Sequence, residues 1–236
     1  MTAEPHDEDG DGSFDACDNC PATANVNQAD TSEETVHAFP DGVGDACDPR
    51  PGAAGDVLRF YSFASEAQGA AWTGAGWSIS GDALHASGRA TWTSTRSLQG
   101  DGYLVRADVA SLAAAPGNAF AITLDGDGVS TGATCRLTDS LLAVSEAGSA
   151  MNQVALVNVV APGELLTLFA WRTITLSGTT RIPELTCRIV HGGEMKETSL
   201  VLTDELTTGM HVIDAQDVSV DITSLSVYTS PGPKNP

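Results

Sequence analysis

Residues 103–109 read Tyr-Leu-Val-Arg-Ala-Asp-Val. Tyr103, Val105, Ala107 and Val109 take every second position, and a period of two is the side-chain period of a β-strand. The stretch therefore predicts a strand with one buried face. The same alternation dominates the chain from residue 57 onward.

A similar stretch lies near the end of the chain. Apolar side chains share one face of residues 217–228 up to Ile222, and Leu225 and Val227 continue the pattern after a shift. Further strands are predicted at residues 57–63, 89–95, 118–124, 132–138, 152–159, 166–176, 183–190 and 196–202.

Turn-forming residues separate these strands. They are Ser80-Gly81-Asp82, Gly100-Asp101-Gly102, Asp125-Gly126-Asp127-Gly128 and His191-Gly192-Gly193. No amphipathic helix longer than two turns is recognisable. Many short strands joined by turns predict an all-β fold, an antiparallel two-sheet sandwich at residues 57–229 that is large enough to bury a full core.

The first part of the chain has a different composition. Residues 1–48 hold 13 Asp and Glu and no Lys or Arg, whereas the remaining residues carry 18 acidic and 11 basic side chains. Such an acidic surface repels nucleic acid and anionic lipid, and divalent cations are its natural counter-charge. No apolar run approaches the roughly 18 residues of a membrane helix. Nucleic-acid binding and direct membrane insertion are therefore not expected.

Pro and Gly mark the boundary between the two parts, because neither residue continues a helix or a central strand. We expect an acidic segment at residues 1–48, a linker at 49–56, the sandwich at 57–229 and a flexible tail at 230–236. The sandwich should fold without help from the acidic segment.

The acidic segment contains a twelve-residue loop. Residues 7–18 read Asp-Glu-Asp-Gly-Asp-Gly-Ser-Phe-Asp-Ala-Cys-Asp, with carboxylates at positions 1, 3, 5, 9 and 12. Gly12 permits a sharp turn, and Ser13 offers its backbone carbonyl. Calcium takes six to eight oxygen ligands, so the loop predicts a Ca²⁺ site. The expected ligands are Asp7, Asp9, Asp11, Ser13, Asp15 and Asp18.

The loop pattern recurs thirty residues later, where residues 41–48 repeat the Asp-Gly and Asp-Ala-Cys-Asp of residues 11–18. Between them lie Asp18-Asn19-Cys20-Pro21, Asn25, Gln28 and Asp30. With these motifs, residues 7–48 resemble a thrombospondin type 3 repeat. The resemblance implies an irregular chain wound around calcium ions and a disulfide between Cys20 and Cys47.

The second loop departs from the family pattern, because an insertion of seven residues separates Asp30 from Asp41. Position 3 falls on Ser32 or inside the insertion, and spacing leaves open whether Glu33 or Glu34 replaces it. The expected ligands are Asp30, Asp41, the Val43 carbonyl, Asp45 and Asp48. The segment has too few large apolar residues for a core, so we expect it to be disordered without calcium.

The chain has five cysteines. Cys135 and Cys187 lie in similar predicted strands, where they either form a disulfide or are two small buried residues. By the family pattern Cys17 pairs in a preceding repeat; otherwise it stays free or pairs between molecules. A zinc site is the alternative for the first three cysteines, with His37 as a distant fourth ligand.

The cysteines and the predicted calcium ligands also indicate in which compartment the protein works. Disulfides and calcium sites of extracellular type both imply an oxidising, calcium-rich exterior. No signal peptide opens the chain at Met1, so we expect either a cytoplasmic protein or a mature or trimmed secreted one, and the cysteines favour the second.

The predicted sandwich resembles concanavalin-like and laminin-G-like jelly rolls. The resemblance is carried by Phe60-Tyr61-Ser62-Phe63, Trp72 and Trp77, the strand from Gly102 to Val109, Val218-Ser219-Val220-Asp221-Ile222, and Ser226-Val227-Tyr228. It implies a secreted or cell-surface calcium-binding module for adhesion or recognition, with an extracellular glycan or a cell-surface protein as partner.

Two alternatives remain, a secreted glycoside hydrolase of the same fold and a structural spacer or cap of a repeat array. Glucanases of this fold carry Glu-x-Asp-x-x-Glu along a strand, and the chain has no such triplet. The nearest groups are His191, Glu194 and Glu197 at a predicted hairpin. We therefore expect no enzyme.

Aromatic rings that stack on sugars would support glycan binding. Trp72, Trp77, Trp92 and Trp171 are the candidates, although a Trp in a sandwich is more often a core residue. Trp72 and Trp92 are predicted to be the more exposed pair. The turn that begins at Asp125 either holds a further metal at a loop rim or is a plain hairpin turn.

Overall fold

The computed structural model describes residues 6–36, 38–95, 102–114, 117–126, 131–147, 151–156, 160–161, 163–203 and 210–230. Its strands are β1 (Val57–Tyr61), β2 (Trp72–Ser80), β3 (Ala83–Ser94), β4 (Gly102–Ala113), β5 (Ala119–Leu124), β6 (Ala133–Leu137), β7 (Leu141–Glu146), β8 (Met151–Ala155), β9 (Leu166–Ser177), β10 (Thr180–His191), β11 (Glu194–Val201) and β12 (His211–Ser230). Two short 3₁₀ turns, η1 (Ser32–Val36) and η2 (Glu66–Ala71), complete the elements. The chain is all-β, as predicted.

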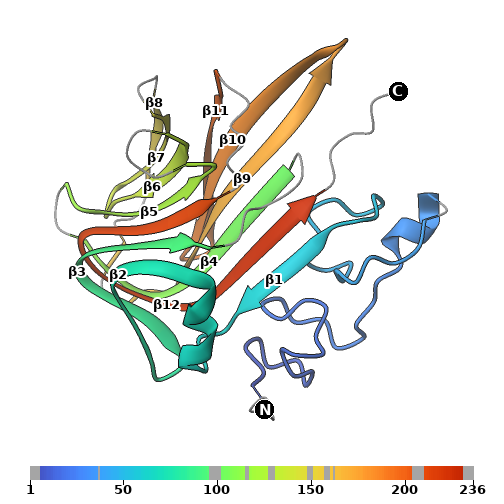
Figure 1. The fold of residues 1–236 in the computed structure, drawn as a ribbon, viewed down its shortest axis with the longest axis horizontal. Coiled ribbons are helices and arrows are strands. Elements are labelled where there is room, and N and C mark those ends of the chain that lie inside the picture. Colours follow the sequence, from blue (N-terminus) through green and yellow to red (C-terminus); the bar gives the residue numbers. More distant parts are fainter. Residues whose placement is uncertain are drawn as a thin grey trace.

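The strands form one antiparallel sheet that folds over into two layers. The hydrogen-bonded order is β11-β10-β9-β4-β12-β5-β6-β7-β8, and β1 and β3 also pair with β12. The first half of the 20-residue strand β12 pairs with β3 and β5, and its second half pairs with β4 and β1. Because β12 bends, it belongs to both layers (Figure 1).

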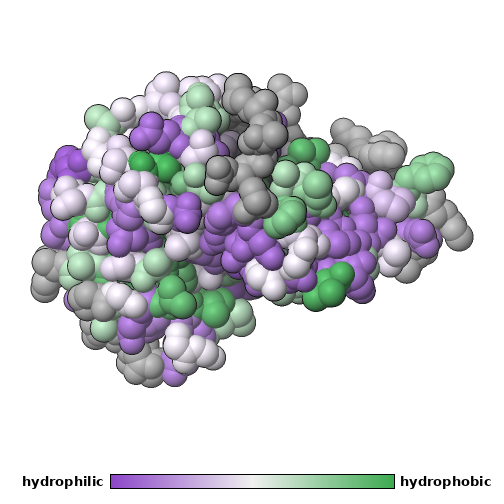
Figure 2. All heavy atoms as spheres, turned by 90° about the horizontal axis from the view of Figure 1, so that it is seen from below, coloured by the Kyte–Doolittle hydropathy of each residue, from purple (hydrophilic) through white to green (hydrophobic). Residues whose placement is uncertain are grey.

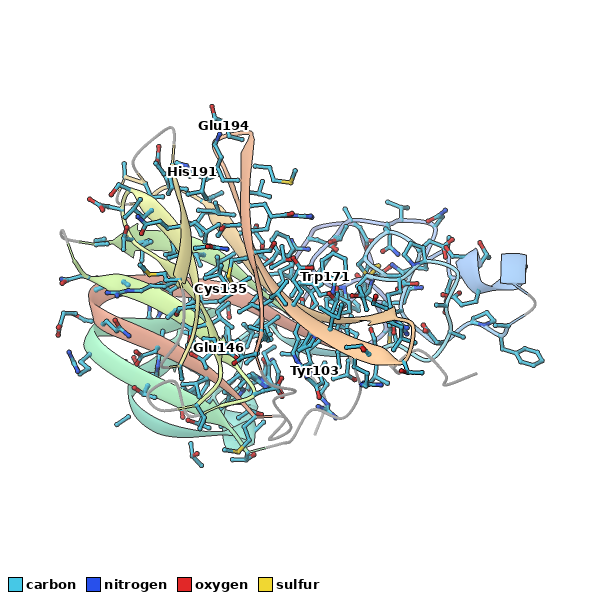
Figure 3. All side chains as sticks on the ribbon, turned by 90° about the horizontal axis from the view of Figure 1, so that it is seen from above. Tyr103, Cys135, Glu146, Trp171, His191 and Glu194 are labelled. Carbon is cyan, nitrogen blue, oxygen red and sulfur yellow. A yellow bond between two sulfur atoms is a disulfide. The ribbon has the colours of Figure 1, made fainter. Side chains whose placement is uncertain are left out.

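The layers pack face to face, with β6, β7 and β8 against β10 and β11. A disulfide between Cys135 on β6 and Cys187 on β10 joins them. Figure 3 shows Cys135 between the two layers. Between them lies a closed apolar core that includes Phe120, Ile122 and Leu168, none of which is exposed to solvent. This two-layer arrangement is the sandwich that the alternating pattern predicts.

Strand β12 confirms the shifted alternation. Ile222, Leu225 and Val227 are all buried. The register of β12 against β4 shifts between Ile222 and Ser224, so a bulge carries the apolar face past an extra residue. The predicted change of phase is therefore a real irregularity of the strand.

Two predicted turns are confirmed, at residues 80–82 and at residues 191–193. Both place a glycine in the left-handed region, Gly81 at φ 55° and Gly192 at φ 56°. The other two predicted turns lie partly outside the described residues, as do the end of the predicted strand 152–159 and nearly all of the tail.

The structure adds two strands that the alternation did not predict, β2 and β7. Every other predicted strand overlaps a strand of the structure.

The acidic segment lies beside β1 (Figure 1) and contacts β4 and β12. The Arg106 guanidinium on β4 donates a hydrogen bond to the Thr23 hydroxyl at 2.6 Å, and Glu8 contacts Thr223 on β12. Ser226 and Tyr228, on the outer face of β12, are buried in consequence. Figure 2 shows the segment as a largely hydrophilic extension beside the sandwich. Within the described residues, neither helical turn is long and apolar enough to cross a bilayer.

Candidate metal centres

The first acidic loop gathers three carboxylates. Oxygens of Asp7, Asp9 and Asp11 lie within 4.8 Å of one another. Gly10 and Gly12 both adopt positive φ angles, 75° and 99°, and their N–H groups donate to the Asp7 carboxylate at 2.8 and 3.0 Å. The loop therefore winds tightly around Asp7, and the two glycines make this turn possible.

Asp9 carries one carboxylate oxygen that is buried without a hydrogen-bond partner among the described residues. Its Oδ1 accepts the N–H of Asp11, whereas its Oδ2 is buried and has no hydrogen-bond partner among the described residues. Burial raises the pKa of Asp9, and the charges of Asp18, Asp11 and Asp7 raise it further. A cation placed among these groups would relieve both effects.

Two residues outside the loop hold the remaining carboxylates in place. The Asp11 carboxylate accepts hydrogen bonds from the Ser13 N–H (2.7 Å), the Asn25 N–H (2.9 Å) and the Gln28 amide (3.2 Å), and these bonds lower its pKa. The Gln28 amide also donates to Asp18 at 3.0 Å. Asn25 and Gln28, noted only as parts of the repeat, thus position two predicted ligands.

The second loop repeats this arrangement across its insertion. Oxygens of Asp30, Glu33 and Asp41 lie within 4.8 Å of one another. The Gly42 N–H donates to Asp30 at 2.9 Å, as the matching glycine of the first loop donates to its first aspartate. The insertion forms the 3₁₀ turn η1, which brings Glu33 between the two aspartates. Spacing left open whether Glu33 or Glu34 supplies the third carboxylate of this loop, and the residue that lies in the cluster is Glu33.

Glu33 is the strongest sign that this loop holds a cation. Its side chain is 0% exposed, and neither of its oxygens has a hydrogen-bond partner among the described residues. Asp30 Oδ1 is also buried and unpartnered. Burying an ionised carboxylate without a partner costs several kcal/mol, so the residues present fit a bound cation.

Ser13 and Val43 hold equivalent places, one in each loop. The N–H of Ser13 donates to Asp11 at 2.7 Å, and that of Val43 donates to Asp41 at 3.0 Å. The Val43 side chain is buried. The backbone of both loops therefore takes the same course at the residue whose carbonyl is predicted to bind the ion.

Asp15 lies outside the first carboxylate cluster. One of its oxygens accepts the Glu8 N–H at 3.0 Å, and the other is hydrogen-bonded to the His6 ring at 2.8 Å. Asp15 ties the end of the loop to its beginning.

Asp45 plays the corresponding part in the second loop. It accepts hydrogen bonds from the N–H and hydroxyl groups of both Thr31 and Ser32, at 2.7 to 3.0 Å. The Ser32 hydroxyl and then the two N–H groups lower the pKa of Asp45 to about 2. The carboxylate is satisfied by this set of donors, which holds the start of η1.

Asp18 and Asp48 close the two loops. Each accepts the N–H of the residue two positions later, at 2.7 Å in both cases. Burial, followed by the nearby carboxyl groups of Asp56 and Glu33, raises the pKa of Asp48 to about 7. Asp56 is a residue that the motif did not include.

Four of the cysteines form two disulfides: the one that the family resemblance implied, and the one that the sequence left open for Cys135 and Cys187. Cys20 is bonded to Cys47, and Cys135 is bonded to Cys187. The zinc alternative is therefore wrong, because two of its ligands are joined to each other; its fourth, His37, lies outside the described residues. Cys17 is exposed and free.

The expected exposed tryptophan pair is wrong. Trp72 and Trp92 are 5% and 8% exposed, and their rings stack on each other at 5.0 Å. His211 packs edge-on against Trp72 at 4.8 Å. The pair is part of the core, whereas Trp77 and Trp171 are only partly buried.

The first acid of the turn at Asp125 is paired with an arginine side chain. The Asp125 carboxylate is buried and pairs with the Arg172 guanidinium at 3.2 Å. Arg172 in turn lies over the Tyr103 ring at 5.2 Å. An arginine therefore already neutralises the side chain proposed for a rim metal, and Asp127 lies outside the described residues.

Two acidic side chains near the β10–β11 hairpin have partners there. His191 is bonded to Glu164 at 2.7 Å, and Glu197 pairs with Arg188 at 2.6 Å. Figure 3 shows His191 and Glu194 at the hairpin tip, far from Trp171. Glu194 and Glu197 both lie on β11, but a separation of three residues places them on opposite faces of the strand.

Comparisons with known proteins identify the fold. No protein-family model and no curated protein matches the chain. The legume lectin-like domain from Entamoeba histolytica is similar in structure, with a TM-score of 0.55 and 10% identity over 70% of this chain and 93% of its own. The exoplasmic/lumenal domain of VIP36, in a Ca²⁺/Man3GlcNAc-bound form, has a TM-score of 0.52 and 10% identity over 71% and 87%. The sandwich therefore has the fold of legume lectin-like, concanavalin-like domains.

Proposed function

We propose that this chain is a secreted, calcium-stabilised recognition module. In this proposal residues 7–48 are a thrombospondin type 3 repeat, and the legume lectin-like sandwich binds the partner. The observation that carries it is the set of buried carboxylate oxygens on Asp9, Asp30 and Glu33 that accept no hydrogen bond among the described residues. One divalent cation in each loop compensates several of these charges at once.

The donor atoms favour calcium over other ions. Each cluster offers only oxygens, which suit hard cations, and a flexible irregular loop suits the six to eight ligands of Ca²⁺ better than the strict octahedron of Mg²⁺. The first ion would be held by Asp7, Asp9, Asp11, the Ser13 carbonyl and Asp18. The second would be held by Asp30, Glu33, Asp41, the Val43 carbonyl and Asp48.

Asp15 and Asp45 take a different part in this proposal. Their oxygens already accept hydrogen bonds from the start of each loop. We assign them as positioning residues, which hold the ligand-bearing backbone in place without contacting the ion.

An extracellular location fits both features of the segment. The Cys20–Cys47 and Cys135–Cys187 disulfides persist in an oxidising compartment. Calcium sites of extracellular modules are filled at roughly millimolar ion, which is available outside the cell.

The partner class follows from the fold. The VIP36 structure contains calcium and a mannose-containing glycan. This likeness supports an extracellular glycan as the ligand of the sandwich, with a cell-surface protein as the other candidate for an adhesion role. No catalytic role is proposed, because Glu197 is engaged in an ion pair with Arg188 and Glu194 lies on the opposite face of β11.

Calorimetric titration with CaCl₂ tests the metal sites. Asp9→Ala and Asp11→Ala should each remove one binding event relative to the wild-type chain, because each takes away a carboxylate of the first cluster. Glu66→Gln, which neutralises an exposed acid in η2, is the matched control and should bind calcium like the wild type. Unchanged stoichiometry in both cluster variants would rule out the first site.

A glycan array, screened once with calcium and once with chelator, tests the recognition role. Binding that disappears with the chelator supports the proposed module. Absence of binding together with release of reducing ends from polysaccharides would favour a glycoside hydrolase. Absence of both would favour a spacer or cap.

A further inference from the structure

One buried acid next to the second loop lies directly before the first strand of the sandwich. Asp56 immediately precedes strand β1 and is 1% exposed. Its Oδ1 accepts hydrogen bonds from the Arg50 guanidinium, at 3.1 Å from Nε and 2.5 Å from Nη2. Its Oδ2 is buried and has no hydrogen-bond partner among the described residues.

The backbone fixes Asp56 beside the second loop. The N–H groups of Gly55 and Asp56 both donate to Asp41 Oδ2, at 2.8 and 2.7 Å. Asp41 is itself one of the three clustered acids. The start of β1 is therefore held directly against the carboxylate cluster.

The Asp56 carboxyl group faces the closing aspartate of the second loop. The Asp48 carboxyl lies within hydrogen-bonding reach of the carboxyl groups of both Asp56 and Glu33. Asp48 Oδ2, Asp56 Oδ2 and both oxygens of Glu33 are buried and accept no hydrogen bond among the described residues. All three side chains are more than nine-tenths buried.

In the first loop, hydrogen-bond donors occupy the position that corresponds to Asp56 in the second. There, Asp11 Oδ2 accepts the Asn25 N–H, which lies fourteen residues later, just as Gly55 lies fourteen residues after Asp41. The neighbouring Gln28 amide then donates to the closing aspartate, Asp18. In the second loop the side chain that meets the closing aspartate is the acid Asp56, which offers no proton to donate when ionised.

We infer that Asp56 is a ligand of the second calcium ion, and that this ion ties the acidic segment to the first strand of the sandwich. The inference rests on the proposed calcium function and adds a ligand from outside the repeat. Carboxylates that face one another without donors repel when they are ionised, and a shared cation removes that repulsion. Asp41 and Asp56 also line a groove of about 730 Å³ that opens to solvent, which gives the ion a path of entry.

Arg50 does not replace the ion. Its guanidinium binds the other oxygen of Asp56, so one carboxylate can serve both the arginine and the cation. The two roles are separable by mutation, because Arg50→Gln removes the ion pair and leaves the carboxylate.

Calorimetric titration of the full chain with CaCl₂ tests this assignment. Asp56→Asn should weaken one site by at least about tenfold, because it removes a charged ligand and keeps the shape of the side chain. Arg50→Gln should bind calcium as tightly as the wild type or more tightly. Glu33→Gln, which changes a ligand of the proposed function itself, should weaken the same site.

The outcomes separate the two claims. If Asp56→Asn binds calcium like the wild type while Glu33→Gln loses a site, the inference is overturned and the proposed calcium function stands. If Glu33→Gln also binds like the wild type, the second site itself is wrong. Should Asp56→Asn fail to fold because Arg50 is left without its partner, the double variant Arg50→Gln/Asp56→Asn removes both charges and should show the same tenfold loss.

Thermal unfolding gives an independent readout of the tie. Calcium should raise the melting temperature of the sandwich in the wild type, since a ligand that binds only the folded state stabilises it. The shift should shrink more in Asp56→Asn than in Asp9→Asn, which damages only the first loop. Equal shifts in the two variants would contradict a bridging ion.

Discussion

The acidic segment and the sandwich bury opposite kinds of side chain. In the sandwich, strands β5 and β9 bury Phe120, Ile122 and Leu168, and the buried acid Asp125 in the turn after β5 is matched by an arginine. In the described part of the segment, the buried residues include Glu33 and Asp48, whose free oxygens face other acids. The sandwich is stabilised by removing apolar surface from water. The segment is stabilised by the charges that neutralise its buried carboxylates.

The comparison predicts its largest effect on calcium removal. At a calcium concentration 100 times the dissociation constant, each ion stabilises the folded segment by about 2.7 kcal/mol. Chelation removes both ions, which together are worth about 5.4 kcal/mol, and should speed hydrogen exchange of segment amides, such as the Gly44 N–H bonded to the Asn19 carbonyl, by up to roughly 10,000-fold. Mass spectrometry of the exchanged peptides measures this.

Amides of the sandwich provide the internal control for that experiment. The ladder between β9 and β10 packs on the apolar core, and its exchange rate should change far less between calcium and chelator than that of the segment. Equal protection of the segment in both buffers would show that its acids are satisfied without ions and would remove the contrast between the two regions.

The two disulfides give the next largest effects, and they should differ in kind. Opening Cys135–Cys187 by double substitution to Ala releases a loop of 52 residues and should cost the sandwich about 4 kcal/mol. Opening Cys20–Cys47 releases 27 residues, worth about 3.5 kcal/mol to the segment. Urea unfolding followed by tryptophan fluorescence should detect mainly the first, because all four tryptophans lie in the sandwich.

Calcium titration separates the same two variants. Loss of Cys20–Cys47 should weaken calcium binding, because this disulfide links the ends of the two loops. Loss of Cys135–Cys187 should leave calcium affinity unchanged. If loss of Cys135–Cys187 weakened calcium binding and loss of Cys20–Cys47 did not, the assignment of the calcium sites to the acidic segment would be wrong.

Most of the fold is readable from side-chain alternation, and the exceptions have physical causes. In β2, Gly74 and Gly76 lie where the strand twists against β3, and a Cβ at either position would meet backbone atoms of β3 at 3.0 Å or less. Glycine and exposed neighbours erase the alternating pattern there. Strand β7 begins with a continuous apolar run, which a period of two does not recognise.

The candidate site was only partly predictable. The motif gives Asp7, Asp9 and Asp11 because their spacing is local. Glu33 depends on a 3₁₀ turn inside an insertion, and spacing alone cannot choose it over its neighbour Glu34. Asp56 follows the repeat, and only the return of the chain to Asp41 brings it to the cluster.

The tryptophan error has a similar origin. A strand pattern shows that side chains alternate between two faces, but it does not show what covers each face. Trp72 and Trp92 stack on one another and are closed off by Phe63 and His211. These contacts join residues that are far apart in the sequence, so no local signal marks the pair as buried.

A smaller effect is expected from the residue that positions the second loop. Asp45→Ala removes the acceptor for Thr31 and Ser32 at the start of η1, and so frees the turn that carries Glu33. Loss of such a supporting group typically weakens metal binding about 10- to 100-fold, and we expect the lower end because the loop retains its disulfide. Calorimetry should show one weakened site. Two weakened sites, or none, would contradict the assignment.

The smallest expected effect belongs to a surface pair of the sandwich. The His85 ring is hydrogen-bonded to Asp221 at 2.7 Å and to the Ser80 carbonyl at 2.7 Å. These two bonds raise the pKa of His85 above its ordinary value of 6.5, against a small opposing effect of burial. The folded state therefore binds the proton more tightly than the unfolded chain does.

The sign of the pH dependence follows from this shift. The stabilisation is complete below the unfolded pKa and is lost as pH rises through the raised folded pKa, so His85→Gln should be less stable than the wild type at pH 5.5 and nearly equal to it at pH 9. The difference should stay below about 1 kcal/mol, because the pair is partly exposed to solvent. Urea midpoints measured in chelator, where the acidic segment contributes least, isolate the effect. Acid should strengthen this pair, whereas it should release calcium from the segment and so destabilise it. If the stability of both regions changed with pH in the same direction, the proposed difference in their electrostatics would be wrong.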